Sequence, residues 1–255
     1  MASICINKRE MASIPVLEVV QRNVGTKSAP TVIYYHGFTS AKEHNLDTAF
    51  LLAEKGYRVI LPDSLHHGER ESGLTNSEKN LAFWDIIIQN VKELEELYGF
   101  LMDNNMIEEG RIGIAGTSMG GITTASALRL FPWIKCAAVL MGSPMLEDFT
   151  SDLISKYKEQ IDIPISEEEI EKLYNRIKPY DLSKDITKLN HRPLLFWHGE
   201  NDSVVPYRFT QDFYNHVNKQ YNYKENIRLI SEKNRDHKVS RFAKLETVKW
   251  FEKHL

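Results

Sequence analysis

The sequence predicts an α/β fold, in which a mostly parallel central sheet carries helices on both faces, with an amino-terminal antiparallel hairpin and a small helical cap. Three observations lead to this prediction. The chain has 255 residues, enough for one large layered domain. Short apolar, β-branched runs alternate with amphipathic segments along most of its length. The sequence Gly-Thr-Ser-Met-Gly, centred on Ser118, joins one of these runs to a predicted helix.

The predicted strands begin with a hairpin. From Ile4 to Val20, two β-rich stretches flank a polar centre, which is typical of an antiparallel hairpin at the edge of a sheet. The later runs are short and mostly apolar, and Gly, Pro, His or Asp residues bound them. We predict strands at Thr31 to Tyr35, Tyr57 to Leu61, Arg111 to Ala115, Cys136 to Met141, Leu194 to Trp197 and, more polar than the rest, Asn226 to Ile230.

Between the strands, apolar residues recur at three- and four-residue spacing, which predicts helices. These cover Leu46 to Lys55, Leu81 to Asp103, Gly120 to Leu130, Tyr207 to Val217 and Val239 to Lys253. One interval, from Pro144 to His191, is instead polar, helix-prone and rich in acidic residues. We therefore expect a single domain over residues 1–255, with residues 144–191 inserted as a helical cap over the site.

Composition excludes several classes of protein. Hydrophobic residues make up 42% and charged residues 26% of the chain, and the net charge is -3 with both signs interspersed. The sequence has no basic patch that would indicate a nucleic-acid or membrane partner, so we expect a small-molecule substrate. Cys5 and Cys136 lie far apart without metal-ligand spacing, so neither a structural disulfide nor a metal site is expected. The oligomeric state is left open.

The amino-terminal residues predict no export signal. The segment from Met1 to Val20 carries Lys8, Arg9 and Glu10 in its middle and lacks an uninterrupted apolar stretch before a cleavage site. No apolar run approaches the roughly 20 residues that a membrane-spanning helix needs. We therefore expect a cytoplasmic protein.

The turn at Ser118 predicts a nucleophile. It follows the predicted strand Arg111 to Ala115 directly, and a helix begins at once. A serine in such a sharp turn needs neighbours two residues away without side chains, and Gly116 and Gly120 meet this need. The Met119 amide would lie at the helix amino terminus, where its proton has no partner within the helix and can bind an oxyanion.

A serine hydroxyl needs a base, and the strand-turn-helix arrangement requires the acid and then the histidine to follow the serine, each on a loop after a later strand. Asp202 follows the strand Leu194 to Trp197, and His237 follows the last predicted strand. We expect Asp202 to orient His237, with Asp236 as an alternative acid.

The segment after the first parallel strand predicts the second oxyanion donor. Gly37 lets the backbone turn so that the Phe38 amide faces the serine, and two such donors stabilise a tetrahedral intermediate. Two histidines in the loops at this edge, His36 and His67, are candidates for substrate binding. His36 also suits a structural role, and His66 and His67 suit a pocket-shaping or hydrogen-bonding role, because further metal ligands are not found.

The motifs YHGFTS, PDSLHHGER, GTSMGG, WHGENDSVVP and RDH, in this order, resemble the α/β-hydrolase superfamily, and most closely its bacterial esterases of the YitV/YjfP type. The resemblance covers nearly the whole chain. It implies Ser118, Asp202 and His237 as a triad, Phe38 and Met119 as oxyanion donors, and no cofactor. Broader relatives include dienelactone hydrolases and prolyl-oligopeptidase-like peptidases, so the fold leaves the substrate open.

The sequence departs from the patterns of two related groups of enzymes, and both departures narrow the expected class of substrate. A serine stands where dienelactone hydrolases use a cysteine, and Phe38 interrupts the HGGG motif of many lipases. We therefore expect a carboxylic-ester hydrolase that forms an acyl-enzyme, with the cap and the aromatic residues Phe38 and Phe149 restricting it to short acyl chains. The alternatives are a peptidase or amidase with the same triad and a binding protein without activity.

Overall fold

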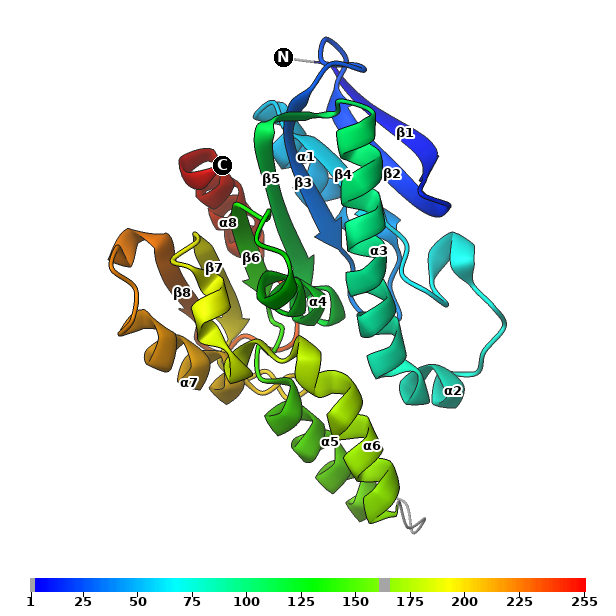
Figure 1. Cartoon of the computed structure of the whole chain (residues 1–255), viewed down its shortest axis with the longest axis vertical. Helices are drawn as coiled ribbons and strands as arrows, with labels where there is room; N and C mark the ends of the chain where they lie inside the picture. Colours follow the sequence, from blue (N-terminus) through cyan, green and yellow to red (C-terminus); the bar gives the residue numbers. More distant parts are fainter. Residues whose placement is uncertain (1–2, 161–165) are drawn as a thin grey trace.

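A computed structural model describes residues 3–160 and 166–255 of the chain and contains one eight-stranded sheet (Figure 1). The strand order is β1-β2-β4-β3-β5-β6-β7-β8, and all pairs from β4 to β8 are parallel. The bounds are Ile4–Met11 (β1), Ile14–Gln21 (β2), Ala29–Tyr35 (β3), Arg58–Pro62 (β4), Ile107–Thr117 (β5), Cys136–Leu140 (β6), Leu194–Gly199 (β7) and Ile227–Glu232 (β8). The predicted mostly parallel sheet is confirmed.

The amino-terminal hairpin is also confirmed, and it forms one edge of the sheet. A two-residue turn joins β1 to β2, and its residues Ala12 and Ser13 both have positive φ, 51° and 61°, as tight hairpins require. A buried ion pair fixes the hairpin to β4, since Arg58 donates to Glu18 at 2.8 Å. Arg58 also donates to three backbone carbonyls of neighbouring loops, so each nitrogen of its buried guanidinium has an acceptor.

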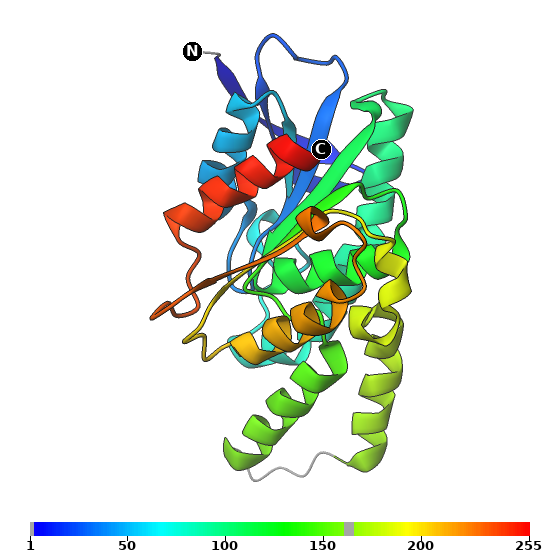
Figure 2. The same cartoon turned by 90° about the vertical axis from the view of Figure 1, so that its left-hand side faces the viewer.

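Helices cover both faces of the sheet, as predicted (Figures 1 and 2). Their bounds are Leu46–Glu54 (α1), Asn76–Leu81 (α2), Phe83–Asp103 (α3), Met119–Leu130 (α4), Leu146–Gln160 (α5), Glu167–Ile177 (α6), Tyr207–Asn218 (α7) and Arg241–His254 (α8). Apolar residues of α1 and α8 form one buried cluster with the sheet, and those of α3, α4 and α7 form another on the opposite face. The alternating strand faces therefore supply two cores.

Most predicted boundaries differ from the structure by one or two residues, and three differences are instructive. The helix predicted from Leu81 is two helices that meet at Ala82, and α2 begins earlier because Thr75 and Glu78 form a reciprocal capping box. The last helix begins at Arg241, since the Ser240 hydroxyl accepts from the Ala243 amide and caps it. Strand β5 begins four residues earlier than predicted and passes through Gly110 at φ 71°, an irregularity that apolar periodicity does not reveal.

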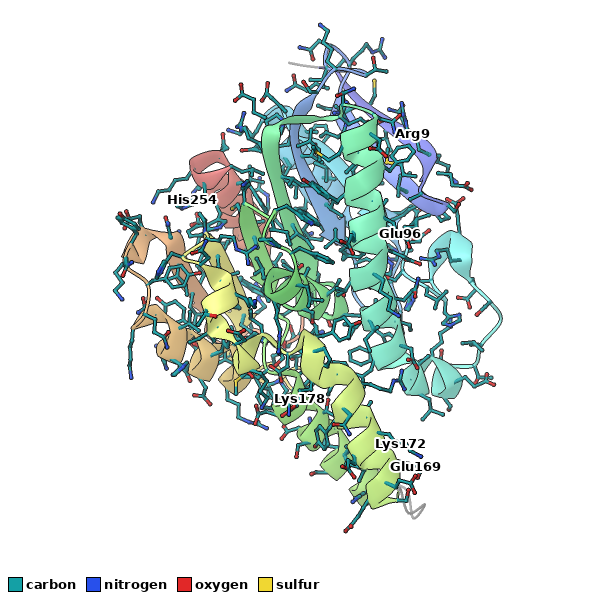
Figure 3. The ribbon with its side chains drawn as sticks, in the orientation of Figure 1. Arg9, Glu96, Glu169, Lys172, Lys178 and His254 are labelled. Atoms are coloured by element: carbon teal, nitrogen blue, oxygen red, sulfur yellow. The ribbon has the colours of Figure 1, made fainter. Side chains whose placement is uncertain are left out.

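Helices α5 and α6 extend beyond the carboxyl ends of the parallel strands, away from the two cores (Figures 1 and 2). Charged side chains cover the outer surface of α6, where Glu169 and Lys172 are labelled in Figure 3. The short 3₁₀ helices Lys178–Tyr180, Leu182–Lys184 and Ile186–Leu189 lead back to β7. Residues 161–165 of the interval predicted as a cap lie outside the described residues.

Among the described helices, none is both long enough and apolar enough to cross a bilayer.

Candidate active site

Ser118 lies at the turn between β5 and α4, at the carboxyl edge of the sheet. Its backbone has φ 55° and ψ -116°. Residues other than glycine rarely adopt this combination, which costs of order 1–3 kcal/mol. The Ser118 amide donates to the Leu140 carbonyl at 2.8 Å, which holds the turn against β6. The strained backbone projects the hydroxyl out of the sheet toward the loops after β7 and β8.

The glycines beside Ser118 are sterically required. A Cβ at Gly116 would lie 2.2 Å from the Gly120 carbonyl oxygen, and a Cβ at Gly120 would lie 2.2 Å from the Tyr35 carbonyl oxygen. Both contacts are with backbone, which cannot move away as a flexible side chain could. The clearance expected at both positions is thus present, and it lets α4 pack directly on β3 and β5.

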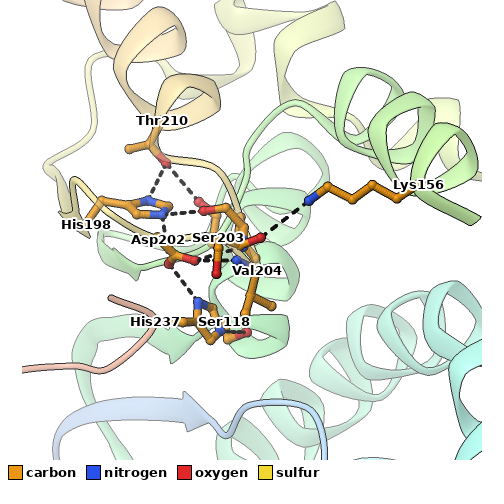
Figure 4. A network of polar contacts seen from close by, with 10 residues as sticks. Ser118, Lys156, His198, Asp202, Ser203, Val204, Thr210 and His237 are labelled. Atoms are coloured by element: carbon orange, nitrogen blue, oxygen red, sulfur yellow. Dashed lines mark hydrogen bonds and ion pairs between the residues drawn. The ribbon is translucent and has the colours of Figure 1, made fainter. Parts of the chain in front are cut away.

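A continuous chain of hydrogen bonds links Ser118, His237 and Asp202 (Figure 4). The Ser118 hydroxyl lies 2.8 Å from His237 Nε2, and His237 Nδ1 lies 2.6 Å from Asp202 Oδ2. The carboxylate can only accept from Nδ1–H, so Nε2 is the nitrogen that can accept the serine proton. The structure brings the three predicted residues together with the geometry of a nucleophile, a base and an orienting acid.

Asp202 is held as a carboxylate. Its other oxygen, Oδ1, accepts from the Val204 and Val205 amides, each at 2.9 Å. Burial alone would raise the pKa of Asp202, but hydrogen bonds from His198 and His237 hold that pKa well below its usual range. The carboxyl side chain has no exposed surface, so its charge acts on these partners without screening by solvent.

The loop that carries His237 is fixed by the loop after β7. The Asn201 amide donates to the Arg235 carbonyl at 2.9 Å, and a Cβ at Gly199 would lie 2.5 Å from that same carbonyl oxygen. Only a glycine at position 199 leaves room for this close approach. Asp236, the alternative acid, is adjacent to His237, but His237 Nδ1–H donates to Asp202.

The loop after β3 passes close to the nucleophile. A Cβ at Gly37 would lie 3.5 Å from the Ser118 Cβ, so the backbone before Phe38 is in near contact with the serine. A turn follows, in which the Ser40 amide donates to the Gly37 carbonyl at 3.2 Å. The Gly37 contact brings the segment that carries the Phe38 amide beside Ser118, and Met119 follows Ser118 directly, so both expected oxyanion donors belong to segments next to the serine.

His36 and His67 position this loop and present no surface to a substrate. Both are buried; His36 Nε2 accepts from the Ser64 amide and His67 Nε2 accepts from the Thr39 amide, each at 3.0 Å. Their Nδ1 atoms face the carbonyls of Gly37 and Leu65. Every ring nitrogen has a backbone partner, which favours the structural and hydrogen-bonding roles of these histidines over the expected substrate contact.

Burial keeps both rings uncharged. It lowers the pKa of His36 to about 4 and also lowers the pKa of His67. A neutral imidazole can accept a backbone N–H at Nε2 while it donates from Nδ1, which is what both sites require. The two rings lie 5.3 Å apart and join the loop after β4 to the loop that carries Phe38.

A buried ion pair reinforces the same junction. Asp63, with no exposed surface, accepts from the Lys42 ammonium, from the Lys42 amide at 3.1 Å and from the Glu69 amide at 2.9 Å. Burial would raise the pKa of Asp63, yet these hydrogen bonds lower it. Burial would lower the pKa of Lys42, yet hydrogen bonds to the carboxylates of Asp63, Glu69 and Glu43 raise it. Both groups are therefore charged over the ordinary pH range.

An aromatic cluster lies between the Phe38 loop and α5. Neighbouring rings stand edge to face at centroid distances of 5.1–6.2 Å. In order from the loop to α7 they are Phe38, Phe83, Trp84, Phe149 and Phe209. Met119 and Leu146 belong to the same buried cluster, so the wall beside the nucleophile is apolar.

The sequence matches one protein-family model over most of its length. Residues 45–255 match the model of the "Prolyl oligopeptidase family". The chain belongs to the prolyl oligopeptidase family. The matched region contains Ser118, Asp202, His237 and the helices α1 to α8, whereas the hairpin and β3 precede it.

Relatives of this prolyl oligopeptidase family member carry esterase names. The chain is 44% identical to the "Putative esterase YitV" of Bacillus subtilis (strain 168), over 98% of this chain and 99% of that protein. It is 34% identical to the "Esterase YjfP" of Escherichia coli (strain K12), over 79% of this chain and 80% of that protein. Among solved structures, TT1662 from Thermus thermophilus superimposes with a TM-score of 0.77 at 16% identity, over 98% of each chain.

These likenesses agree with the resemblance seen in the sequence and establish the α/β-hydrolase fold. The chain is therefore a hydrolase. Of the residues 3–160 and 166–255, none form a group of three or more His, Cys, Asp or Glu side chains suited to a metal ion.

Two groups that support the site were not predicted from the sequence. Asp63 stands in the quoted PDSLHHGER segment but was given no role, Lys42 lies outside the quoted motifs, and only the packing of two loops reveals their contact. His198 stands in the quoted WHGENDSVVP segment but was given no role, although it lies four residues before Asp202 and contacts it at 3.2 Å. Its place at the carboxyl end of a predicted strand, beside the acid, was the signal that could have singled it out.

Proposed function

We propose that this chain is a serine carboxylesterase that cleaves short-chain esters through an acyl-enzyme on Ser118. The observation that carries the proposal is the unbroken hydrogen-bond chain from Ser118 through His237 to Asp202, built on a strained turn. The esterase names of YitV and YjfP support the ester as the substrate class. The buried aromatic cluster supports a short acyl chain.

In the proposed reaction, His237 Nε2 takes the proton of the Ser118 hydroxyl as its oxygen attacks the ester carbonyl. The tetrahedral oxyanion accepts from the Met119 and Phe38 amides, and charge develops there only as the bond forms. The imidazolium then gives its proton to the departing alcohol. Water, activated by the same nitrogen, attacks the acyl-enzyme and releases the acid, while Asp202 stabilises the imidazolium in both steps.

Residues 144–191 act in this proposal as a cap inserted into a single domain. Helix α5 places Phe149, which is buried, against Trp84 and Phe209, so the cap contributes part of the apolar wall. Each methylene that a pocket buries contributes about 0.8 kcal/mol, but only while space remains for it. Rings packed edge to face leave little such space, which favours acetate or butyrate over long acyl groups.

The experiment is hydrolysis of p-nitrophenyl esters from acetate to palmitate by the wild type, Ser118→Ala and Ser203→Ala. Ser203 is exposed on the neighbouring loop, so Ser203→Ala is the matched control and should keep wild-type activity. Serine-dependent turnover that peaks at short chains supports the proposal. Full activity of Ser118→Ala would refute the nucleophile, and a maximum above about eight carbons would refute the short-chain preference.

The role of the apolar wall beside the nucleophile in selecting acyl-chain length can be tested separately. Phe149→Ala should move the optimum toward longer esters by opening space beside the nucleophile, while the reaction of Ser118 with a fluorophosphonate continues. An unchanged chain-length profile would contradict a role of the cap in substrate size. No labelling of Ser118 in folded wild-type protein would instead favour a binding protein without activity.

The family match favours amide hydrolysis as the second candidate, because the family is named for peptidases. The same triad could protonate an amine leaving group from His237. Matched substrates with one acyl group, p-nitrophenyl acetate and p-nitroacetanilide, together with peptide p-nitroanilides, separate the two functions. Serine-dependent cleavage of the anilides without cleavage of the esters would select the amidase.

A further inference from the structure

A second histidine lies on the far side of the proposed acid. His198, at the end of β7, has no exposed surface, and its Nε2 atom lies 3.2 Å from Asp202 Oδ2. His237 Nδ1 contacts the same oxygen at 2.6 Å, so one carboxylate oxygen lies between two imidazole rings (Figure 4). The proposed reaction gives His198 no part.

The hydrogen bonds around His198 require a proton on each ring nitrogen. Nε2 lies 2.8 Å from the Val205 carbonyl oxygen and also faces the Asp202 carboxylate, both of which can only accept. Nδ1 lies 2.9 Å from the Thr210 hydroxyl, whose single proton is donated to the Gly142 carbonyl at 3.0 Å. The hydroxyl must then accept from Nδ1–H.

A neutral ring would leave one buried group without a partner. If Nδ1 had no proton, the Thr210 hydroxyl would have to turn toward it, and the buried Gly142 carbonyl would lose its donor at a cost of about 1–3 kcal/mol. If Nε2 had no proton, it would face two acceptors at once. The doubly protonated ring satisfies every contact.

We propose that His198 is a positioning residue that remains an imidazolium in the resting protein and neutralises the charge of Asp202 from the side opposite His237. The proposal rests on the proposed function, because its effect on the reaction passes through the triad. A buried cation needs a buried anion beside it, and Asp202 is that partner.

The groups that face His198 support this charge state. On its own loop the titratable neighbour is Asp202, which hydrogen bonds from His198 and His237 help to keep ionised. From α7, Tyr207 presents its ring at 5.8 Å, and Thr210 is neutral. In the sheet, the register partner on β8 is Ser231, which adds no charge.

The buried cation would make His237 easier to keep neutral. Both rings contact one carboxylate oxygen, so their nearest nitrogens are separated by at most about 6 Å, where two like charges repel strongly in a partly buried site. Without the charge on His198, the full negative charge of Asp202 would favour a proton on His237. His198 would thus keep the base free to accept the serine proton at mildly acidic pH.

The first test measures protons and does not depend on turnover. In ¹H–¹⁵N spectra of the folded wild type, with the ring assigned by its loss in His198→Gln, we expect protons on both His198 nitrogens from pH 6 to 8. A bare nitrogen at Nδ1 or Nε2 in this range would overturn the proposal. This result stands whether or not the protein cleaves esters, so it is distinct from failure of the proposed function.

The second test is the pH profile of kcat/KM for p-nitrophenyl acetate. His198→Gln keeps an N–H donor for Asp202 but no charge, so its acidic limb should move up by about one pH unit. His216→Gln, an exposed change on α7, is the matched control and should leave the limb in place. A lower plateau with an unmoved limb would assign His198 a structural role only and overturn the proposal.

Discussion

The Asp63–Lys42 ion pair offers the sharpest test of how the oxyanion loop is held. We consider Asp63→Asn, which keeps the shape of the side chain and removes its charge. Asp63 accepts from Lys42 and from two backbone amides, and neither it nor Lys42 has more than 1% exposed side-chain surface. The NH₂ group of the new asparagine side chain would face at least one of these N–H donors, and that hydrogen bond would be lost.

The expected loss of stability follows from the uncompensated charge. Removing one partner of a buried pair typically costs about 3–5 kcal/mol because the other charge stays buried. Lys42 keeps two half-exposed partners, Glu43 and Glu69, so we expect the lower end, about 3 kcal/mol. The loop that carries Phe38 would shift with Lys42, and kcat/KM should fall by about 10- to 100-fold.

The pH dependence of this loss has a definite sign. Hydrogen bonds from Lys42 lower the folded-state pKa of Asp63 below its unfolded value of about 3.9, against the effect of burial. The stabilisation is therefore complete above that unfolded value and is lost as the pH falls through the folded pKa. The difference between wild type and Asp63→Asn should be constant from pH 6 to 8 and shrink below about pH 4.

Urea unfolding at several pH values measures this difference, and ester hydrolysis at neutral pH measures the effect on the loop. The matched control is Glu71→Gln, which removes the carboxylate of an exposed pair with Lys79 and should leave both readouts unchanged. A stability loss no larger than that of the control would refute the reasoning. So would a loss that persists undiminished below pH 3.

Three further outcomes are expected. Gly120→Ala should destabilise the fold by about 3 kcal/mol in thermal unfolding, because its Cβ would meet backbone at 2.2 Å, whereas Gly99→Ala, with open space in helix α3, should be neutral or stabilising. Asp202→Asn should lower kcat/KM by about 10⁴-fold, and a loss below tenfold would contradict its role. Because burial raises the pKa of the Cys136 thiol, Ellman's reagent at pH 8 should modify only Cys5 until urea unfolds the chain.

Much of the architecture was predictable because local pattern and chain order determine it. Apolar runs specify buried strands wherever they lie, so the parallel sheet and the edge hairpin followed from periodicity. The candidate triad followed from one turn and one rule of order, since Asp202 and His237 each come after a later strand of the sheet.

What could not be predicted depends on contacts between loops. His36 and His67 carry the residue type of a binding site, and only the backbone amides of Ser64 and Thr39 show that they support the loop instead. The protons of His198 depend on a hydroxyl from α7 and a carbonyl that follows β6, segments that no local pattern joins. Periodicity likewise gives no sign of the break at Ala82, which α2 and α3 share as a cap.

The hydrogen bonds of the candidate triad join residues 119 and 35 positions apart in the chain, on loops after β5, β7 and β8. Contacts of such long range form slowly, because the chain loses loop entropy before the contact stabilises it. Strand β8 is also the edge strand on the side opposite the hairpin, so the contact of His237 with Ser118 requires β8 to be paired with β7. Recovery of activity during refolding would thus report the final step of folding, later than the helical signal of circular dichroism.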